Sequence, residues 1–319
     1  MASKFHPIFL TLALLTPSLR GTSTQPVVNQ IGVFLRCTGR DDPREALAAV
    51  RAVGLDMIQV SRLPDRFYTP EGAREFAGLM KKSGIRASSV VVVFDGESYR
   101  DRDAVEATVG FRPQASLEAR LRYARRCVDF AARLGVKIVT FHMGFLPKDA
   151  DDPIYQRMLD AVRRIAGYAE SQGVTISLET GQETGEELAR FLDQITGARV
   201  GVNFDTANLV LYGIDDPPKA LRRLLDRVTS VHVKDGMPPE DPRKLGREVR
   251  LGEGRAEVEK CLRILSDAGF RGPLVIENYV WRESGADPLD ELRRANEFIR
   301  RTWPPAGGRQ TPSSQELIP

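Results

Sequence analysis

Ionisable side chains recur in this sequence at the points where short apolar runs end. The segments that show this are Phe141-His142-Met143-Gly144, Leu178-Glu179-Thr180, Phe204-Asp205-Thr206-Ala207-Asn208, His232-Val233-Lys234-Asp235 and Ile276-Glu277-Asn278. A single carboxylate in such a place is usually a solvated surface charge. Glu179 and Glu277, however, directly follow apolar stretches, and a buried carboxylate needs a partner that offsets its desolvation. A shared cation is the simplest partner, so the pattern predicts that these groups converge on a cation site.

Three carboxylates and one imidazole from these segments would form a hard, oxygen-rich set of ligands. Such a set favours Mn²⁺, Mg²⁺ or Co²⁺ over a thiolate-type zinc site. A divalent ion here would polarise two adjacent oxygens of a hydroxy-ketone and acidify the C–H group between them. If the strands close into a ring, Glu179 and Glu277 can flank a small ligand, one removing a proton from one face and the other returning a proton to the opposite face.

The residues between these points indicate how the chain positions them. Apolar runs, predicted to be strands, alternate with segments of helical periodicity, and most are apolar throughout, as in strands buried on both faces. The runs cover residues 31–37, 55–61, 85–95, 136–144, 174–181, 198–205, 228–235 and 272–279. Their spacing of about 34 residues is that of a βα unit, which predicts an α/β fold, a single (β/α)₈ TIM barrel. A doubly wound sheet would need a glycine-rich turn after the first strand, which residues 36–41 do not supply.

Two connections are longer than a minimal loop. Residues 96–113 and 236–254 follow the third and seventh predicted strands, and we expect both to border the substrate site at the carboxyl ends of the strands. The turn Gly252-Glu253-Gly254 could bind phosphate through backbone N–H groups or simply begin the next helix, and we favour the simple turn. Whether the substrate is phosphorylated stays open.

Composition and the chain ends limit the remaining classes of function. The 319 residues carry 46 Lys and Arg against 43 Asp and Glu, and a net charge of +3 argues against a nucleic-acid partner. Three distant cysteines exclude a disulfide framework and a zinc cluster. Residues 1–28 form a leader, a signal peptide or a disordered segment, whose short apolar run lacks a clear cleavage site, which favours a cytoplasmic location over export. We expect no membrane span, a barrel over residues 29–303 and a flexible tail over 304–319.

The ordered motifs FHMG, LET, NFDTAN, VHVKDG, LGEG and VIEN resemble the sugar phosphate isomerase/epimerase superfamily, the xylose isomerase-like TIM barrels. The resemblance covers roughly residues 31–303. It implies one divalent metal ion, Mn²⁺ first and Mg²⁺ or Co²⁺ as alternatives. The four ligands it implies are Glu179, Asp205, His232 and Glu277, and Glu179 and Glu277 would also be the catalytic acid/base pair. The neighbouring residues that we expect to bind substrate are His142, Asn208, Lys234 and Asp235.

The sequence also departs from two members of this superfamily. Ketose 3-epimerases usually carry a histidine and an arginine where this chain has Asn208 and Pro238. Endonuclease IV proteins share that histidine and add an Asp-x-His before the Gly-x-Gly loop, where this chain has residues 248–250 of a different type, so DNA repair is disfavoured. We therefore expect a metal-dependent isomerase or epimerase that transfers a proton next to the carbonyl of a small sugar, sugar phosphate or keto-polyol. An inosose-type dehydratase and a non-catalytic sugar-binding barrel are the alternatives, and homo-oligomerisation stays open.

Overall fold

The computed structural model describes residues 30–303 of the chain. The predicted leader and tail lie outside the described residues. Among the helices that are described, none combines the length and the apolar character that crossing a membrane requires.

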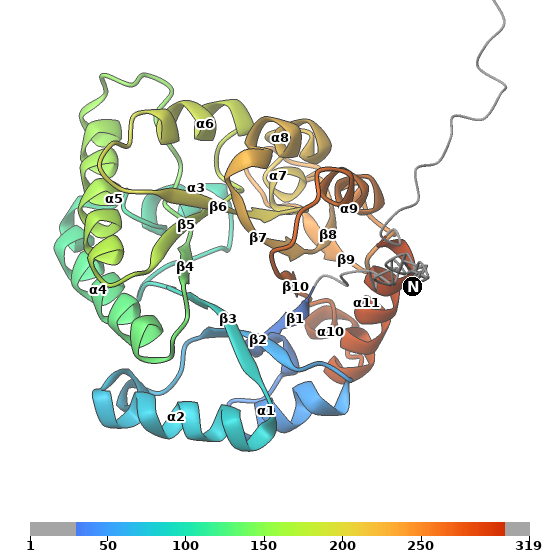
Figure 1. Cartoon of the computed structure of the whole chain (residues 1–319). Helices are drawn as coiled ribbons and strands as arrows, with labels where there is room; N and C mark the ends of the chain where they lie inside the picture. The colour runs from blue at the N-terminus through green and yellow to red at the C-terminus, as the bar shows by residue number, and fades with distance from the viewer. Residues whose placement is uncertain (1–29, 304–319) are drawn as a thin grey trace, which may run out of the picture.

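Parallel strands form a closed barrel, as predicted (Figure 1). The strands are β1 (Ile31–Phe34), β2 (Met57–Ser61), β3 (Arg86–Val91), β4 (Ile138–Phe141), β5 (Thr175–Glu179), β6 (Val200–Asp205), β7 (Val228–Val233) and β10 (Leu274–Ile276). Each of them lies within one of the predicted apolar runs. The ring closes where Val33 of β1 pairs with Ile58 of β2 on one side and with Ile276 of β10 on the other. In this ring β1 lies opposite β5 and β2 lies opposite β6.

Helices surround the barrel and bury their apolar faces against it (Figure 1). The longer ones are α1 (Pro43–Ala52), α2 (Pro70–Ser83), α4 (Leu117–Arg133), α5 (Pro153–Ser171), α6 (Gly185–Asp193), α8 (Pro217–Leu224), α9 (Val258–Asp267) and α11 (Pro288–Thr302). Aspartates cap two of these helices: the carboxylates of Asp42 and Asp287 accept hydrogen bonds from backbone N–H groups in the first turns of α1 and α11, and a proline follows each aspartate. Such caps satisfy donors that would otherwise lack a partner.

Short elements that the periodicity did not reveal occupy the connections. The predicted loop 96–113 contains α3 (Arg102–Thr108), and the segment 236–254 contains most of an antiparallel hairpin of β8 (Asp235–Met237) and β9 (Arg247–Val249). The other short helices are η1 (Leu35–Thr38), η2 (Asp65–Tyr68), η3 (Gln114–Ser116), α7 (Asn208–Leu211), η4 (Leu225–Arg227) and α10 (Trp281–Ser284). The elements η1, α7, β8 and α10 begin within five residues of the ends of β1, β6, β7 and β10, so they lie at the carboxyl end of the barrel.

Candidate active site

Strand alternation brings the predicted ligands to the inside of the barrel. Successive side chains of a strand point to opposite faces, so Asp205 faces the same way as buried Asn203, and His232 the same way as buried Ser230. The register then places Asp205 directly beside His232. Glu179 is the last residue of β5, and Glu277 follows the end of β10. The carboxyl end of the barrel therefore carries one inward-facing polar cluster, as the strand-end pattern predicted.

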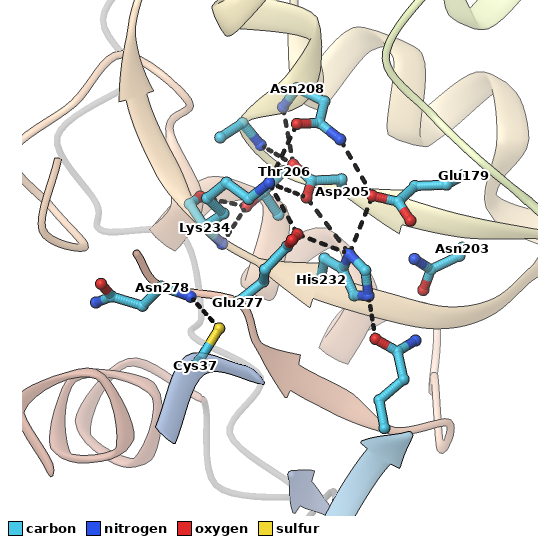
Figure 2. Close-up of polar contacts among 12 residues, drawn as sticks. Cys37, Glu179, Asn203, Asp205, Thr206, Asn208, His232, Lys234, Glu277 and Asn278 are labelled. Carbon is cyan, nitrogen blue, oxygen red and sulfur yellow. Dashed lines mark hydrogen bonds and ion pairs between the residues drawn. The ribbon is translucent and has the colours of Figure 1, made fainter. Parts of the chain in front are cut away.

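The four predicted ligands form a compact set of donor atoms. One atom from each of Glu179, Asp205, His232 and Glu277 lies within 4.8 Å of all the others. The Nδ1 atom of His232 lies 3.1 Å from Oε1 of Glu179 and 3.0 Å from Oε2 of Glu277 (Figure 2). Oδ2 of Asp205 and Oε2 of Glu277 are buried and accept no hydrogen bond of normal geometry. Both oxygens instead lie within ion-pair distance of the Lys234 ammonium group, so they already face positive charge, and this set fits a divalent metal ion.

A glutamine that the sequence pattern did not single out holds the ring of His232. Oε1 of Gln59, on β2, lies 2.6 Å from Nε2 of His232, and both side chains are buried. An amide oxygen can only accept, so Nε2 carries a hydrogen and Nδ1 is the nitrogen that faces the carboxylates. In this metal-free arrangement burial lowers the pKa of His232, but Glu179 and Glu277 more than compensate and raise it well above its ordinary value.

Lys234 and Asn208 lie within the same cluster (Figure 2). Nζ of Lys234 lies 2.8 Å from Oε2 of Glu277 and 3.2 Å from Oδ2 of Asp205. Asn208 accepts a hydrogen bond from Lys234 and donates one, at 3.2 Å, to Glu179. Although burial raises the pKa of Glu277, the charges of Lys234 and His232 lower it to about 2. The lysine therefore keeps this carboxylate ionised.

His142 extends the cluster on the β4 side. Its Nε2 atom lies 3.2 Å from Oε1 of Glu179, whereas its buried Nδ1 atom has no hydrogen-bond partner among the described residues. Burial lowers the pKa of His142, but Glu179 raises it to about 9. Burial in turn raises the pKa of Glu179, and His142 and His232 together hold it well below its ordinary value. Glu179 is thus an ionised carboxylate between two imidazoles.

The structure places Asp235 outside this cluster. Its carboxylate accepts hydrogen bonds from the backbone N–H groups of Gly236, Gly252, Gly254 and Ala256, at distances from 2.9 to 3.1 Å. A Cβ atom on Gly254 would lie 2.1 Å from Oδ1 of Asp235, so only glycine fits there. Asp235 holds the loop between β7 and α9, and its carboxylate has no free oxygen for a sugar. The Gly252-Glu253-Gly254 segment is accordingly a structural turn.

A cavity of about 420 Å³ opens above the cluster, a size suited to a small sugar. Six of the predicted residues line it: His142, Glu179, Asn208, His232, Lys234 and Glu277. The wall also contains residues that the sequence analysis missed, among them the aromatic side chains of Phe34, Tyr99, Tyr212 and Tyr279 and the arginines Arg36, Arg62 and Arg282. Arg62 directly follows β2 and Arg36 lies two residues after β1, so the same attention to the first strand ends would have found both.

The chain belongs to the xylose isomerase-like TIM barrel family, whose family model matches residues 47–302. This membership and the closed barrel confirm the predicted family and fold. A curated relative is L-ribulose-5-phosphate 3-epimerase UlaE of Escherichia fergusonii, 22% identical over 278 residues, a match that covers 82% of this chain and 90% of the relative.

Solved structures agree with this fold. The xylose isomerase domain protein from Planctomyces limnophilus is 29% identical, with a TM-score of 0.75, and the match covers 85% of this chain and 95% of that one. A xylose isomerase-like TIM barrel protein from Mycobacterium smegmatis, solved in complex with magnesium, is 20% identical with a TM-score of 0.65, covering 88% of this chain and 97% of that one.

Proposed function

We propose that this protein is a metal-dependent sugar isomerase or epimerase, which transfers a proton next to the carbonyl of a small sugar. The observation that carries the proposal is the buried set of three carboxylates and one imidazole at the base of a sugar-sized cavity. The curated relative UlaE, by its name, epimerises a ketose phosphate, which supports the same class of reaction.

Glu179, Asp205, His232 and Glu277 would hold the metal ion, and the oxygen-rich set fits Mn²⁺ best, with Mg²⁺ or Co²⁺ as alternatives. The buried oxygens of Asp205 and Glu277, which accept no hydrogen bond of normal geometry and already face the charge of Lys234, support this assignment. A divalent ion supplies positive charge that stabilises negative charge on two adjacent sugar oxygens and so acidifies the C–H group between them. The magnesium complex of the Mycobacterium smegmatis protein shows that this relative takes a divalent ion.

The proton would be moved by the two glutamates. Glu179 comes from β5 and Glu277 from β10, two strands that β6 and β7 separate in the ring, so their carboxylates approach a ligand from different directions. One carboxylate accepts the proton of the C–H bond, whose electrons form the C=C bond of an enediolate. The other glutamate must carry a proton when substrate binds, and it gives that proton to the opposite face of the same carbon for epimerisation, or to the neighbouring carbon for isomerisation. The pair holds one proton before and after the reaction and two at the enediolate, so atoms and charge balance.

Three neighbours would support this transfer. His142 lies beside Glu179 and Lys234 beside Glu277, and both side chains line the cavity where sugar hydroxyl groups would lie. Asn208 fixes the Glu179 carboxylate and borders the same cavity. We propose that these residues contact substrate as well as the glutamates.

The test is exchange of a carbon-bound proton. Purified protein is analysed for bound metal and then incubated with a panel of ketoses and ketose phosphates in D₂O, with and without chelator. We expect metal-dependent deuterium incorporation that falls at least 10²-fold in Glu179→Gln and Glu277→Gln proteins. Glu118→Gln, an exposed position on α4, is the matched control and should retain full exchange.

Other outcomes would contradict the proposal. A product that has lost water would indicate a dehydratase. Ligand binding that survives chelation, without any exchange, would indicate a sugar-binding barrel. Full exchange in the Glu277→Gln protein would exclude the assigned acid/base pair.

A further inference from the structure

Positive charge gathers on one wall of the cavity. Arg36 lies in η1, which follows β1 in the sequence, Arg62 directly follows β2, and Arg282 lies in α10, which comes after β10. All three line the same cavity as the carboxylates. Because β1 and β2 stand opposite β5 and β6 in the ring, Arg36 and Arg62 lie across the barrel from the strands of Glu179 and Asp205. A substrate held at the carboxylates by one end would therefore reach these arginines with its other end.

The three guanidinium groups have no anionic partner within residues 30–303. None of them takes part in an ion pair or a side-chain hydrogen bond there, whereas other arginines of the protein, such as Arg250 with Glu291 and Arg164 with Glu118, are paired. Arg282 is held instead by stacking, with its guanidinium carbon 4.1 Å from the ring centre of Tyr279. Unpaired guanidinium groups that share a cavity wall attract an anion and offer it several donors in a fixed geometry.

A second, smaller hollow of about 180 Å³ adjoins the cavity at this wall. Arg36, Arg62 and Arg282 line both spaces, and Arg40 lines the smaller one. Its only carboxylate among the lining residues is Asp41, so four guanidinium groups face one acidic group. The hollow therefore carries a positive potential, and it shares Arg36, Arg62 and Arg282 with the wall of the sugar-sized cavity.

The backbone at Arg62 is strained in a way that points to a function. Its φ angle is +45°, a region that residues other than glycine rarely adopt, and the structure places an arginine there instead of a glycine. Strain of this kind persists mainly where it positions a side chain for binding or catalysis. Here the strained backbone directs Arg62, the residue directly after β2, toward the wall of the cavity.

The glycine turn after the seventh barrel strand does not offer a phosphate site in this protein. TIM barrels often bind phosphate with backbone N–H groups of the loops after the seventh and eighth strands. In the loop after β7, the backbone N–H groups of Gly252, Gly254 and Ala256 already donate hydrogen bonds to the carboxylate of Asp235. An anion would therefore find donors at the arginine wall and not at this turn.

We propose that Arg36, Arg62 and Arg282 bind the anionic group of the substrate, a phosphate or a carboxylate, at the end of the sugar remote from Glu179 and Asp205. This inference rests on the proposed function for the reacting end of the sugar and adds the class of substrate, an anionic ketose. The guanidinium groups would bind the anion through paired N–H donors, and the stacked Arg282 would lose little side-chain freedom on binding.

Binding measurements test the proposal separately from catalysis. Affinities of a ketopentose, its 5-phosphate, a ketohexuronate and inorganic phosphate are measured by calorimetry on the metal-loaded and the chelated protein. We expect at least one anionic sugar to bind 10-fold or more tightly than the neutral ketose, and inorganic phosphate to compete with it. Preference for the phosphate ester or for the uronate identifies which anion the wall recognises.

Variants assign this preference to the arginines. Arg36→Ala, Arg62→Gly and Arg282→Ala should each reduce the affinity for the anionic sugar about 10-fold or more and leave that for the neutral ketose unchanged, while Arg282→Lys should retain part of it. Arg271→Ala is the matched control, because it removes the same charge from an exposed position before β10, at the opposite end of the barrel. Equal affinity for neutral and anionic sugars, or an equal effect of the Arg271 variant, would overturn the proposal. Loss of proton exchange with intact anion binding would overturn only the proposed function.

Discussion

Gln59 and His232 are joined by a hydrogen bond of 2.6 Å inside the barrel, between side chains of two strands that are not neighbours. The contact links β2, near the beginning of the chain, to β7, which carries a proposed metal ligand. Because the amide oxygen fixes the hydrogen on Nε2, it also fixes the nitrogen that faces Glu179, Asp205 and Glu277. The orientation of a ligand from the second half of the protein thus depends on a residue in the first.

Replacing Gln59 should weaken metal binding without disrupting the barrel. Gln59→Leu removes the acceptor of His232 Nε2–H, and loss of such an outer partner typically reduces metal affinity 10- to 100-fold. Gln59→Glu keeps an acceptor oxygen and should retain most of the affinity. Competition titration of Mn²⁺ against a chelator measures the metal affinity of both variants. Equal weakening in the two variants would show that Gln59 serves only to fill space.

Lys234 should stabilise the metal-free protein more than the metal-loaded one. Its ammonium group lies between the carboxylates of Asp205 and Glu277 and neutralises charge that a metal ion would otherwise neutralise. Removing one partner of a buried ion pair costs about 3 kcal/mol, so we expect Lys234→Met to lose that much free energy of unfolding in chelator and to gain a larger rise in Tm from Mn²⁺ than the wild type.

Lys219→Met, at an exposed position, is the control for this experiment and should behave as the wild type. Thermal unfolding with and without Mn²⁺ provides the readout. A loss of stability that is the same in both conditions would contradict the idea that lysine and metal neutralise the same charges.

Arg62→Gly should stabilise the fold while it impairs recognition of the anion. Glycine adopts a φ of +45° without steric strain, so we expect a gain of about 1 kcal/mol in the free energy of unfolding. Glu257 has a φ of +48° away from the cavity, and Glu257→Gly should give a similar gain with no effect on anion affinity. Urea unfolding measures the stability. A destabilised Arg62→Gly protein would show that the backbone at this position is not strained.

Glu183 should make stability fall as the pH rises. Its carboxyl is buried without a hydrogen-bond partner among the described residues, and this burial raises its pKa to about 8. Between its unfolded pKa of about 4.5 and 8 the folded protein therefore holds a proton that the unfolded chain has released, which costs up to about 4 kcal/mol of stability at the upper end of that range. In a Glu183→Gln protein this loss should disappear.

Denaturant unfolding at pH 5 and pH 9 measures the free energy of unfolding of the wild type and of the Glu183→Gln protein. The difference between these two free energies should grow with pH. Glu118→Gln is the control: Arg164 holds the pKa of exposed Glu118 below its ordinary value, so the stability that depends on its charge is lost only as the pH falls below about 4.5, and its difference from wild type should stay constant between pH 5 and pH 9. A difference between Glu183→Gln and wild type that does not change with pH would contradict the assigned protonation of Glu183.

The barrel and the ligand cluster could be predicted because both follow from local patterns. Continuous apolar runs indicated strands covered on both faces, and parallel strands bring their carboxyl ends to one rim, so Glu179, Asp205, His232 and Glu277 had to meet there once the fold was known. Their roles as metal ligands and as acid/base pair stay predictions that the experiments above address.

Contacts between distant strands could not be predicted in the same way. Gln59 is one polar residue inside an apolar strand, and its partner lies 173 positions away. Asp235 follows Lys234 at the end of the same run, but the chain leaves the barrel after Val233, so its side chain turns into the loop, which no periodicity reveals. The arginine wall depends on a single backbone torsion at Arg62 and on long side chains whose direction the sequence does not determine.

The proposed metal ligands all come from β5, β6, β7 and β10, whereas the hydrogen bond to His232 and two of the three wall arginines come from β1 and β2 or directly behind them. In the proposed assignment, the residues of the reaction and two of the three residues that select the anion therefore come from different parts of the sequence. A chimaera that takes its first two βα units from another family member, with Gln59 retained, should keep proton transfer to and from the sugar. Its preference among sugar substrates should change.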